Sequence, residues 1–362
     1  MIERVTGNLL EADVEALVNT VNTVGVMGKG LALQFRQAFP ENYQAYQKAC
    51  AQHEVRPGQM FVFTTGQLTN PRYIINFPTK RHWRQKTRIQ DIDDGLGALI
   101  EVVRAKGIRS LAVPPLGCGS GGLAWDEVRP RIEKVLNTLP DVQVLLYEPA
   151  GAPEADHMRI ATKPPRMTPG RAALIGVLNT YALPGYRITM LEIQKLAYFL
   201  QRAGEPLSLD YTKGAYGPYT EVLHHVLQRI EGHFIRGYGD RSRDVSIRVF
   251  PEAVTNAQTF LQHHPETQKR LERVARLIEG FETPYGLELL ATVHWLTQEN
   301  PAVADDVDLA IRGVLAWNAH KRRTFHPEHI RIAWKQLSTE GWFSSAELMG
   351  RDRSTNNGHL GT

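Results

Sequence analysis

The stretch that decides the fold of the first half is residues 19–32, which read Asn-Thr-Val-Asn-Thr-Val-Gly-Val-Met-Gly-Lys-Gly-Leu-Ala. An apolar run ends here in amide side chains and passes through glycines into an amphipathic segment. A strand that turns into a helix in this way presents backbone N–H groups to an anion. The same pattern also fits a tight turn whose glycines only supply positive φ. Because Walker A and Gly-x-Gly-x-x-Gly spacings are absent, the segment predicts a phosphate loop of another kind.

A second glycine-rich stretch strengthens this prediction. Residues 114–123 read Pro-Pro-Leu-Gly-Cys-Gly-Ser-Gly-Gly-Leu, directly after an apolar run and before a helical pattern that starts near Trp125. Four glycines in six residues cost chain entropy, so the backbone there must approach something closely. Two such loops after strands of one open α/β sheet can converge on a single crevice. Together they favour a bound diphosphate.

A third segment carries the reactive side chains. Residues 76–84 read Asn-Phe-Pro-Thr-Lys-Arg-His-Trp-Arg, in which an apolar strand leads through proline to Lys80. A lysine near a ribose can act as a nucleophile or a proton carrier if neighbouring cations or burial lower its pKa. Cations around an aromatic ring also suit a nucleic acid, because they contact its backbone while the ring stacks a base. Taken alone, the segment fits a solvated basic turn better, and the two glycine loops are what favour the functional interpretation.

The first half alternates short apolar runs with longer amphipathic segments, which is typical of an α/β domain with helices on both faces of a sheet. The predicted strands are Ile2–Thr6, Ala16–Thr20, Met60–Thr65, Tyr73–Phe77, Ser110–Pro114 and Val142–Tyr147. The predicted helices are Leu31–Phe39, Glu41–His53, Arg88–Lys106 and Trp125–Leu139.

The second half has a different pattern. Prolines and glycines between residues 149 and 170 indicate a linker, and helical periodicity follows. We therefore predict an α/β domain over residues 1–150, a linker over 151–170, a mainly α-helical domain over 171–348 and a flexible tail over 349–362. One predicted helix of the second domain covers Pro218–Glu231.

Composition excludes several classes of protein. The 362 residues carry a formal charge of only +4, which decides little about the ligand. The two cysteines, Cys50 and Cys118, have no partner at metal-ligand spacing, which argues against a disulfide framework and a zinc site. No apolar run is long enough to span a bilayer. We expect a cytoplasmic protein without membrane contact, metal or cofactor.

The three segments together resemble macrodomains, and within them the ADP-ribosyl glycohydrolase branch found in bacterial antitoxins. Residues 5–10 (Val-Thr-Gly-Asn-Leu-Leu) are similar to the start of the family, and residues 19–32 and 117–123 to its two ligand loops. Lys80, after Asn-Phe-Pro-Thr, resembles the catalytic lysine of this branch. The resemblance covers nearly all of residues 1–150 and implies a mixed sheet between helices.

The resemblance also implies roles for individual residues. Lys80 would act at the scissile glycosidic bond, Asn22 would hydrogen-bond the distal ribose, and Tyr147 would pack on the adenine. The full set of implied ADP-ribose ligands is Asn8, Leu9, Asn22, Gly28, Lys29, Gly30, Gly117, Gly119, Ser120, Gly121, Gly122, Leu123 and Tyr147. The candidate DNA contacts are Arg81, His82, Trp83 and Arg84.

Two positions differ from the family pattern. Asn8 stands where an acidic residue usually follows glycine, and an amide makes a weaker bond to adenine than a carboxylate. The glycine loop lacks the aspartate that related lysine-dependent glycohydrolases carry, so proton transfer falls to the substrate, a water or a residue such as His82.

In the second half, residues 191–200 and 213–219 resemble the toxin-neutralising region of these antitoxins and, more loosely, SocA-type antitoxin domains. An amphipathic helix followed by a Gly-Pro turn is the alternative interpretation. The combined resemblance implies an antitoxin that removes ADP-ribose from a DNA base and binds its cognate ADP-ribosyltransferase toxin. The alternatives are an ADP-ribose reader and a hydrolase of ADP-ribosylated protein carboxylates.

Overall fold

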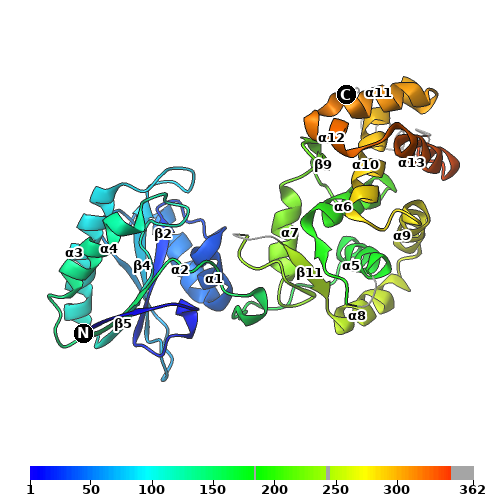
Figure 1. The fold of residues 1–362 in the computed structure, drawn as a ribbon. Helices are drawn as coiled ribbons and strands as arrows, with labels where there is room; N and C mark the ends of the chain where they lie inside the picture. The colour runs from blue at the N-terminus through cyan, green and yellow to red at the C-terminus, as the bar shows by residue number, and fades with distance from the viewer. Residues whose placement is uncertain (183–184, 242–244, 344–362) are drawn as a thin grey trace, which may run out of the picture. The chain divides into compact units, whose positions relative to one another are not determined.

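A computed structural model describes residues 1–182, 185–241 and 245–343 of the chain. The described residues fold as two compact units, the first formed by residues 1–163 with residues 239–241 and the second by the remaining described residues. Figure 1 shows a sheet flanked by helices in the first unit and mainly helices in the second. The predicted tail, residues 349–362, lies outside the described residues, as do residues 344–348 of the predicted helical domain.

The first unit is built on a six-stranded sheet with the order β1-β6-β5-β2-β4-β3. The first five of these strands are parallel, and β3 is antiparallel to β4 at one edge. The strands are β1 (Ile2–Val5), β2 (Ala16–Asn22), β3 (Phe61–Thr64), β4 (Tyr73–Lys80), β5 (Ser110–Val113) and β6 (Gln143–Tyr147). All six predicted strands are therefore confirmed, and the sheet is mixed as expected.

Helices cover both faces of this sheet (Figure 1). Along β2, Ala16 and Val18 pack in one apolar cluster with α3 and α4, while Leu17 packs in another with Phe35 of α1. Both faces of a central strand are apolar because successive side chains point to opposite sides. The four helices are α1 (Gly30–Ala38), α2 (Pro40–Ala51), α3 (Ile89–Lys106) and α4 (Trp125–Leu136), which confirms the four predicted segments.

The end of β4 differs from the prediction, which stopped this strand at Phe77. Pro78 lies inside the strand opposite Val21, and the pairing then shifts so that Asn22 lies opposite Lys80. An irregularity of this kind accommodates proline, which has no N–H to donate to a neighbouring strand. Lys80 is therefore held at the end of a central strand and not in a loop.

The second unit is mainly helical, as predicted. Its helices are α5 (Pro169–Tyr181), α6 (Met190–Arg202), α7 (Val222–Ile230), α8 (Pro251–Leu261), α9 (Pro265–Ile278), α10 (Pro284–Glu299), α11 (Val307–Trp317), α12 (Ala319–Thr324) and α13 (Pro327–Thr339). Short strands complete it: β7 (Ile188–Thr189), β10 (Ile235–Arg236) and β11 (Ser246–Val249) form one sheet, and β8 (Thr212–Gly214) and β9 (Gly217–Tyr219) form a hairpin. Three short 3-10 helices, η1 (Leu9–Glu11), η2 (Ala155–His157) and η3 (Pro301–Ala304), also occur among the described residues.

The predicted helix Pro218–Glu231 is wrong at its start. Pro218 pairs with Lys213 in the β8–β9 hairpin, and α7 begins only at Val222. Gly217, with a φ of 92°, allows the tight turn that precedes β9. The boundary was misplaced because proline often starts a helix, whereas here it lies in a strand that pairs across a turn.

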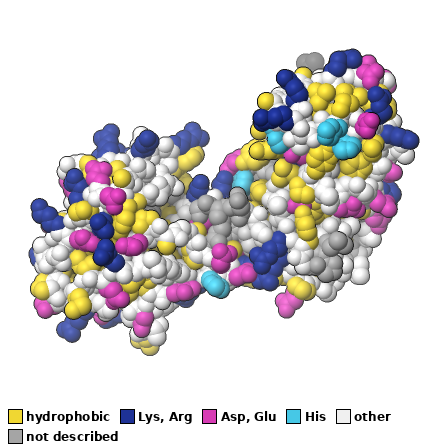
Figure 2. All heavy atoms as spheres, viewed as in Figure 1, with side chains coloured by type: hydrophobic (Ala, Val, Ile, Leu, Met, Phe, Trp, Pro, Cys, Tyr) yellow, Lys and Arg dark blue, Asp and Glu magenta, His cyan; other side chains and the backbone are white. Residues whose placement is uncertain are grey.

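The surface charge of the first unit does not single out a class of ligand. On the face drawn in Figure 2, basic and acidic side chains of the first unit are interspersed with apolar ones. Among the described residues no helix is long and apolar enough to cross a membrane. The described part of the chain also contains no group of three or more His, Cys, Asp or Glu side chains arranged to hold a metal.

Candidate active site

The candidate ligand segments all follow strands of the parallel part of the sheet. In the order β1, β6, β5, β2 and β4, these strands end at Val5, Tyr147, Val113, Asn22 and Lys80. Parallel strands place their carboxyl ends at one edge of a sheet. That edge therefore carries, one after another, the η1 segment, the segment after β6, the glycine loop 117–123, the loop 22–30 and Lys80.

The loop after β2 is organised around Asn22. The Asn22 Oδ1 accepts a hydrogen bond from the Val24 N–H at 2.9 Å, and its Nδ2 donates to the Val26 carbonyl at 2.6 Å. The amide that the resemblance assigns to the distal ribose is thus bonded within its own loop. Gly30, with a φ of 61°, begins α1, and the exposed Lys29 precedes it without a side-chain cap.

Tyr46 of α2 supports the same loop, although no pattern in the sequence indicates this role. Its side chain is fully buried, and its hydroxyl donates to the Asn22 carbonyl at 2.6 Å. Burial raises the pKa of Tyr46 above its ordinary value, so the hydroxyl remains a donor. Tyr46 therefore holds the backbone of the loop in place through the Asn22 carbonyl.

The glycine loop after β5 closes on itself and leaves several donors unused. Leu123 donates its N–H to the Gly117 carbonyl at 3.1 Å, and Gly122 donates to Gly119 at 3.1 Å. Among the hydrogen bonds of the described residues, none uses the N–H of Gly119, Ser120 or Gly121. A short run of unpaired backbone N–H groups is a typical anion site.

The loop is closed from the other side by Thr87, which the sequence analysis did not single out. The Thr87 N–H donates to the Gly121 carbonyl at 3.0 Å. A Cβ on Gly121 would lie 2.2 Å from the Gly117 carbonyl oxygen and 2.3 Å from Thr87 Oγ1. Gly121 is thus required for close backbone packing, which agrees with the expected reason for the glycines.

Lys80 lies against the glycine loop. Its Nζ donates a hydrogen bond to the Ser120 carbonyl, so the amine contacts the loop that carries the unused N–H groups. The side chain is half-buried, and this desolvation lowers the pKa of Lys80 below its ordinary value. A larger fraction of the amine is therefore neutral near pH 7 than for an exposed lysine.

The basic residues after β4 are used in different ways. The Arg81 guanidinium pairs with the buried Asp91 carboxylate at 2.7 Å, and the Arg81 carbonyl accepts from the Thr23 hydroxyl at 2.7 Å. Trp83 is 47% exposed, stacks on His82 and carries the Arg84 guanidinium over its ring at 4.5 Å. Arg81 therefore ties the segment to α3 and to the β2 loop, whereas Trp83 and Arg84 are exposed and His82 beside them is half-buried.

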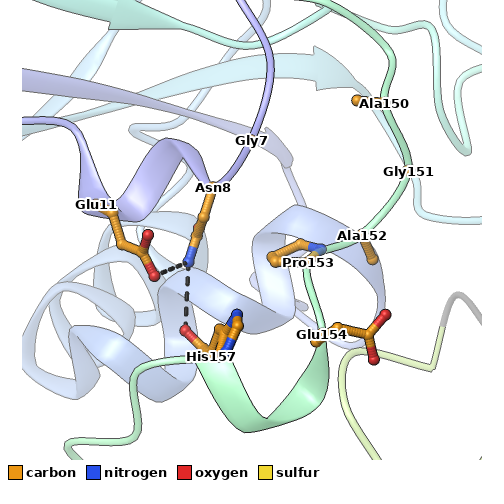
Figure 3. A pocket seen from close by; sticks show the side chains of 9 residues that line it. All are labelled: Gly7, Asn8, Glu11, Ala150, Gly151, Ala152, Pro153, Glu154 and His157. Carbon is orange, nitrogen blue, oxygen red and sulfur yellow. Dashed lines mark hydrogen bonds between the residues drawn. The ribbon is translucent and has the colours of Figure 1, made fainter.

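A cavity of about 280 Å³ lies at the far end of the same edge, after β1 and β6 (Figure 3). Its lining consists of Gly7, Asn8, Glu11, Ala150, Gly151, Ala152, Pro153, Glu154 and His157. Asn8 thus faces a cavity, whereas Leu9 and Tyr147 belong to the apolar cluster packed against the sheet. The segment 150–157 was assigned mostly to the linker, yet it lines this cavity within the first unit.

Comparison with known proteins agrees with this architecture. The Macro domain family model matches residues 18–132. A Thermus aquaticus protein named DNA ADP-ribosyl glycohydrolase is 49% identical, and the match covers 97% of this chain and 97% of that protein. The chain belongs to the DNA ADP-ribosyl glycohydrolase family. Its first unit is a macrodomain, which confirms the resemblance found in the sequence.

Two further proteins are similar to part of this chain. The solved macrodomain of Mycobacterium tuberculosis DarG is 55% identical, covers 41% of this chain and 99% of its own, and gives a TM-score of 0.41. A Thermosipho africanus protein is 36% identical over 40% of this chain and 41% of its own length. It is named a DNA ADP-ribosyl transferase-DNA ADP-ribosyl glycohydrolase fusion protein.

Proposed function

We propose that this protein hydrolyses the N-glycosidic bond between ADP-ribose and a DNA base, with Lys80 as the catalytic side chain. The observation that carries the proposal is the contact of the Lys80 amine with the glycine loop. A diphosphate bound by the N–H groups of Gly119, Ser120 and Gly121 leaves its next sugar beside that amine. The Thermus aquaticus relative is named for this activity.

The order of segments along the sheet edge supports ADP-ribose as the ligand. The ligand is elongated, with adenine at one end, a diphosphate in the middle and the distal ribose at the other end. The edge offers a cavity at β1 and β6, free N–H groups after β5, and an amine at the end of β4. Each chemical group of the ligand therefore has a partner in the matching order.

Lys80 can cleave the bond in one of two ways, and its lowered pKa suits both near neutral pH. As a neutral amine it attacks the anomeric carbon, the base leaves with the electron pair, and water then releases ADP-ribose from the nitrogen. As an ammonium it gives a proton to the departing base while water attacks the anomeric carbon. His82 is a weaker candidate for the second role, because its Nδ1 already accepts from the Arg84 N–H at 3.2 Å.

The exposed Trp83 and Arg84, with His82 stacked on Trp83, support DNA as the substrate. An exposed indole with a guanidinium beside it offers a stacking surface and a phosphate partner. Arg81 contributes less, since its guanidinium is paired with Asp91. His82, Trp83 and Arg84 begin two residues after Lys80, which places them close to the bond to be cleaved.

The test is release of ADP-ribose from a single-stranded oligonucleotide that carries one ADP-ribosylated base. Wild type should release it, Lys80→Ala should be slower by at least a hundredfold, and Lys48→Ala, which changes an exposed lysine of α2, should match wild type. Equal rates for wild type and Lys80→Ala would refute the assignment. Tight ADP-ribose binding without turnover would identify a reader, and release only from modified protein carboxylates would identify the other hydrolase.

We also propose that the second unit binds and inhibits the cognate ADP-ribosyltransferase toxin. The name of the Thermosipho africanus fusion protein pairs the two activities in one relative. In this chain, residues 213–219, which resemble the toxin-neutralising region, lie in the β8–β9 hairpin. Two tyrosine side chains of this hairpin are exposed, Tyr216 by 53% and Tyr219 by 36% of their surface. The hairpin is fixed by hydrogen bonds from Trp317 to Gly214 and from Asn318 to Ala215. Rigid exposed tyrosines are typical of protein interfaces.

Full-length Lys80→Ala separates binding from hydrolysis, because it leaves the second unit unchanged. Added in equimolar amount to the toxin, this variant should block transfer of ADP-ribose to DNA. Tyr216→Ala in the same background should weaken the block, whereas Tyr43→Ala in the macrodomain should not. Undiminished transfer in the presence of Lys80→Ala would contradict direct inhibition.

A further inference from the structure

Both donor hydrogens of the Asn8 side-chain amide are used by protein partners. Its Oδ1 accepts from the Leu10 N–H at 3.1 Å, and its Nδ2 donates to Glu11 Oε1 at 3.0 Å and to the His157 carbonyl at 3.4 Å (Figure 3). An amide nitrogen has only two N–H groups to donate. Asn8 therefore has no donor left for a ligand in the cavity that it lines.

Glu11 brings a carboxylate to this cavity, next to the Asn8 amide. Figure 3 shows its carboxylate beside the Asn8 amide, and among the hydrogen bonds of the described residues Glu11 takes part in only that one through its side chain. An ionised carboxylate has about four acceptor positions, so most of them are open. The Glu11 side chain is exposed to solvent.

The Asn8 side chain positions this carboxylate. Glu11 ends the 3-10 helix η1, whose N-cap is Asn8, so the same side chain caps the helix and holds the carboxylate. Glu11 also lies near Tyr147, since burial and then the charge of Glu11 raise the pKa of the Tyr147 hydroxyl. Tyr147 ends β6, one of the two strands that the cavity follows.

We propose that Glu11 selects adenine by accepting a hydrogen bond from its exocyclic amino group, with Asn8 as the residue that positions Glu11. This rests on the proposed binding of ADP-ribose. A carboxylate only accepts, and adenine presents a donor at position 6 where guanine and hypoxanthine present a carbonyl oxygen. That oxygen would face the carboxylate without a proton between them, which disfavours the wrong base.

The proposal also explains how this chain functions without the acid expected at position 8. The bond from an amino group to a carboxylate is charge-assisted and stronger than a bond to an amide. In this chain the carboxylate is supplied three residues later, and the Asn8 amide becomes its support. Adenine affinity is then maintained by a different residue from the one that the family pattern indicates.

Calorimetric titration of the full chain with ADP-ribose and with inosine diphosphate ribose, its hypoxanthine analogue, tests the assignment. Wild type should bind ADP-ribose at least tenfold more tightly than the analogue. Glu11→Gln should weaken ADP-ribose binding about tenfold and remove most of the preference, because a glutamine amide can donate as well as accept. Glu101→Gln, which changes an exposed acid of α3, should behave as wild type.

The outcomes separate this inference from the proposed function. A Glu11→Gln variant that binds ADP-ribose and keeps the wild-type preference would overturn the role of Glu11 alone, as would a wild type that binds both compounds equally. A wild type that binds neither compound would overturn both proposals. Because Glu11 is exposed, the thermal unfolding temperature of Glu11→Gln should stay close to that of wild type, which excludes misfolding as the cause of a loss.

Discussion

Replacement of Gly121 by alanine tests whether the glycine loop holds a diphosphate through its backbone. The new Cβ would lie 2.2 Å from the Gly117 carbonyl oxygen, and Cβ contacts below 3.0 Å are essentially never seen. The loop must therefore open by about 0.8 Å. Removal of the Thr87 side chain would not relieve the strain, since the closest atom is backbone. Overpacking of this kind costs about 1–3 kcal/mol of stability.

The same displacement should weaken ligand binding. Loss of one hydrogen bond to a charged group, worth about 1.5–3 kcal/mol, lowers affinity about 10- to 100-fold. The assay is calorimetric titration with ADP-ribose, together with thermal unfolding of the full chain. Gly119→Ala is the control for stability, because its Cβ meets nothing within 4 Å and its unfolding temperature should equal that of wild type. Wild-type ADP-ribose affinity in Gly121→Ala would refute the role of this loop.

Three other predictions follow from buried groups. Tyr46→Phe removes the hydroxyl that donates to the Asn22 carbonyl. It should lower the free energy of unfolding by about 1–2 kcal/mol and weaken ADP-ribose binding severalfold. Unchanged ADP-ribose binding would contradict the role of Tyr46 in supporting the loop. The pH profile of kcat/KM for wild type should contain an ionisation below 10.5 that the residual activity of Lys80→Ala lacks. Across this ionisation kcat/KM should rise with pH if the amine attacks and fall with pH if the ammonium donates a proton. An identical pH profile in wild type and Lys80→Ala would contradict a titrating Lys80. Burial lowers the pKa of Lys195 from 10.5 to about 7. Between these two pH values the unfolded chain binds a proton at Lys195 that the folded chain does not bind. The free energy of unfolding should therefore rise with pH in this range. Thermal unfolding of Lys195→Met should lose this rise, whereas Lys335→Met, at an exposed position, should keep it.

The first unit could be predicted closely because its signals are local. Apolar runs such as Ala16–Asn22 and the amphipathic segment of α3 have their own periodicity, and each glycine loop follows a strand directly. The end of β4 could not be predicted in the same way. Pro78 usually ends a strand, but here a shift in pairing with β2 lets the strand continue to Lys80.

The candidate site depends on contacts between residues that are distant in sequence, and these contacts could not be predicted from the sequence. Lys80 and Ser120 are 40 residues apart, and Thr87 reaches the glycine loop from a separate segment. Asn8 was noted as a departure from an acidic residue, but only the fold shows that its amide supports Glu11 and contacts the segment at His157. Single residue types can indicate a reaction, whereas the partners that orient them follow from tertiary packing.

The most direct test of the whole account is a crystal structure of this chain with ADP-ribose bound. In that crystal structure we expect the diphosphate on the N–H groups of Gly119–Gly121, the adenine in the cavity beside Glu11, and the Lys80 Nζ within about 3–3.5 Å of the anomeric carbon. A ligand with its diphosphate away from the glycine loop, or with the distal ribose beyond reach of Lys80, would contradict it.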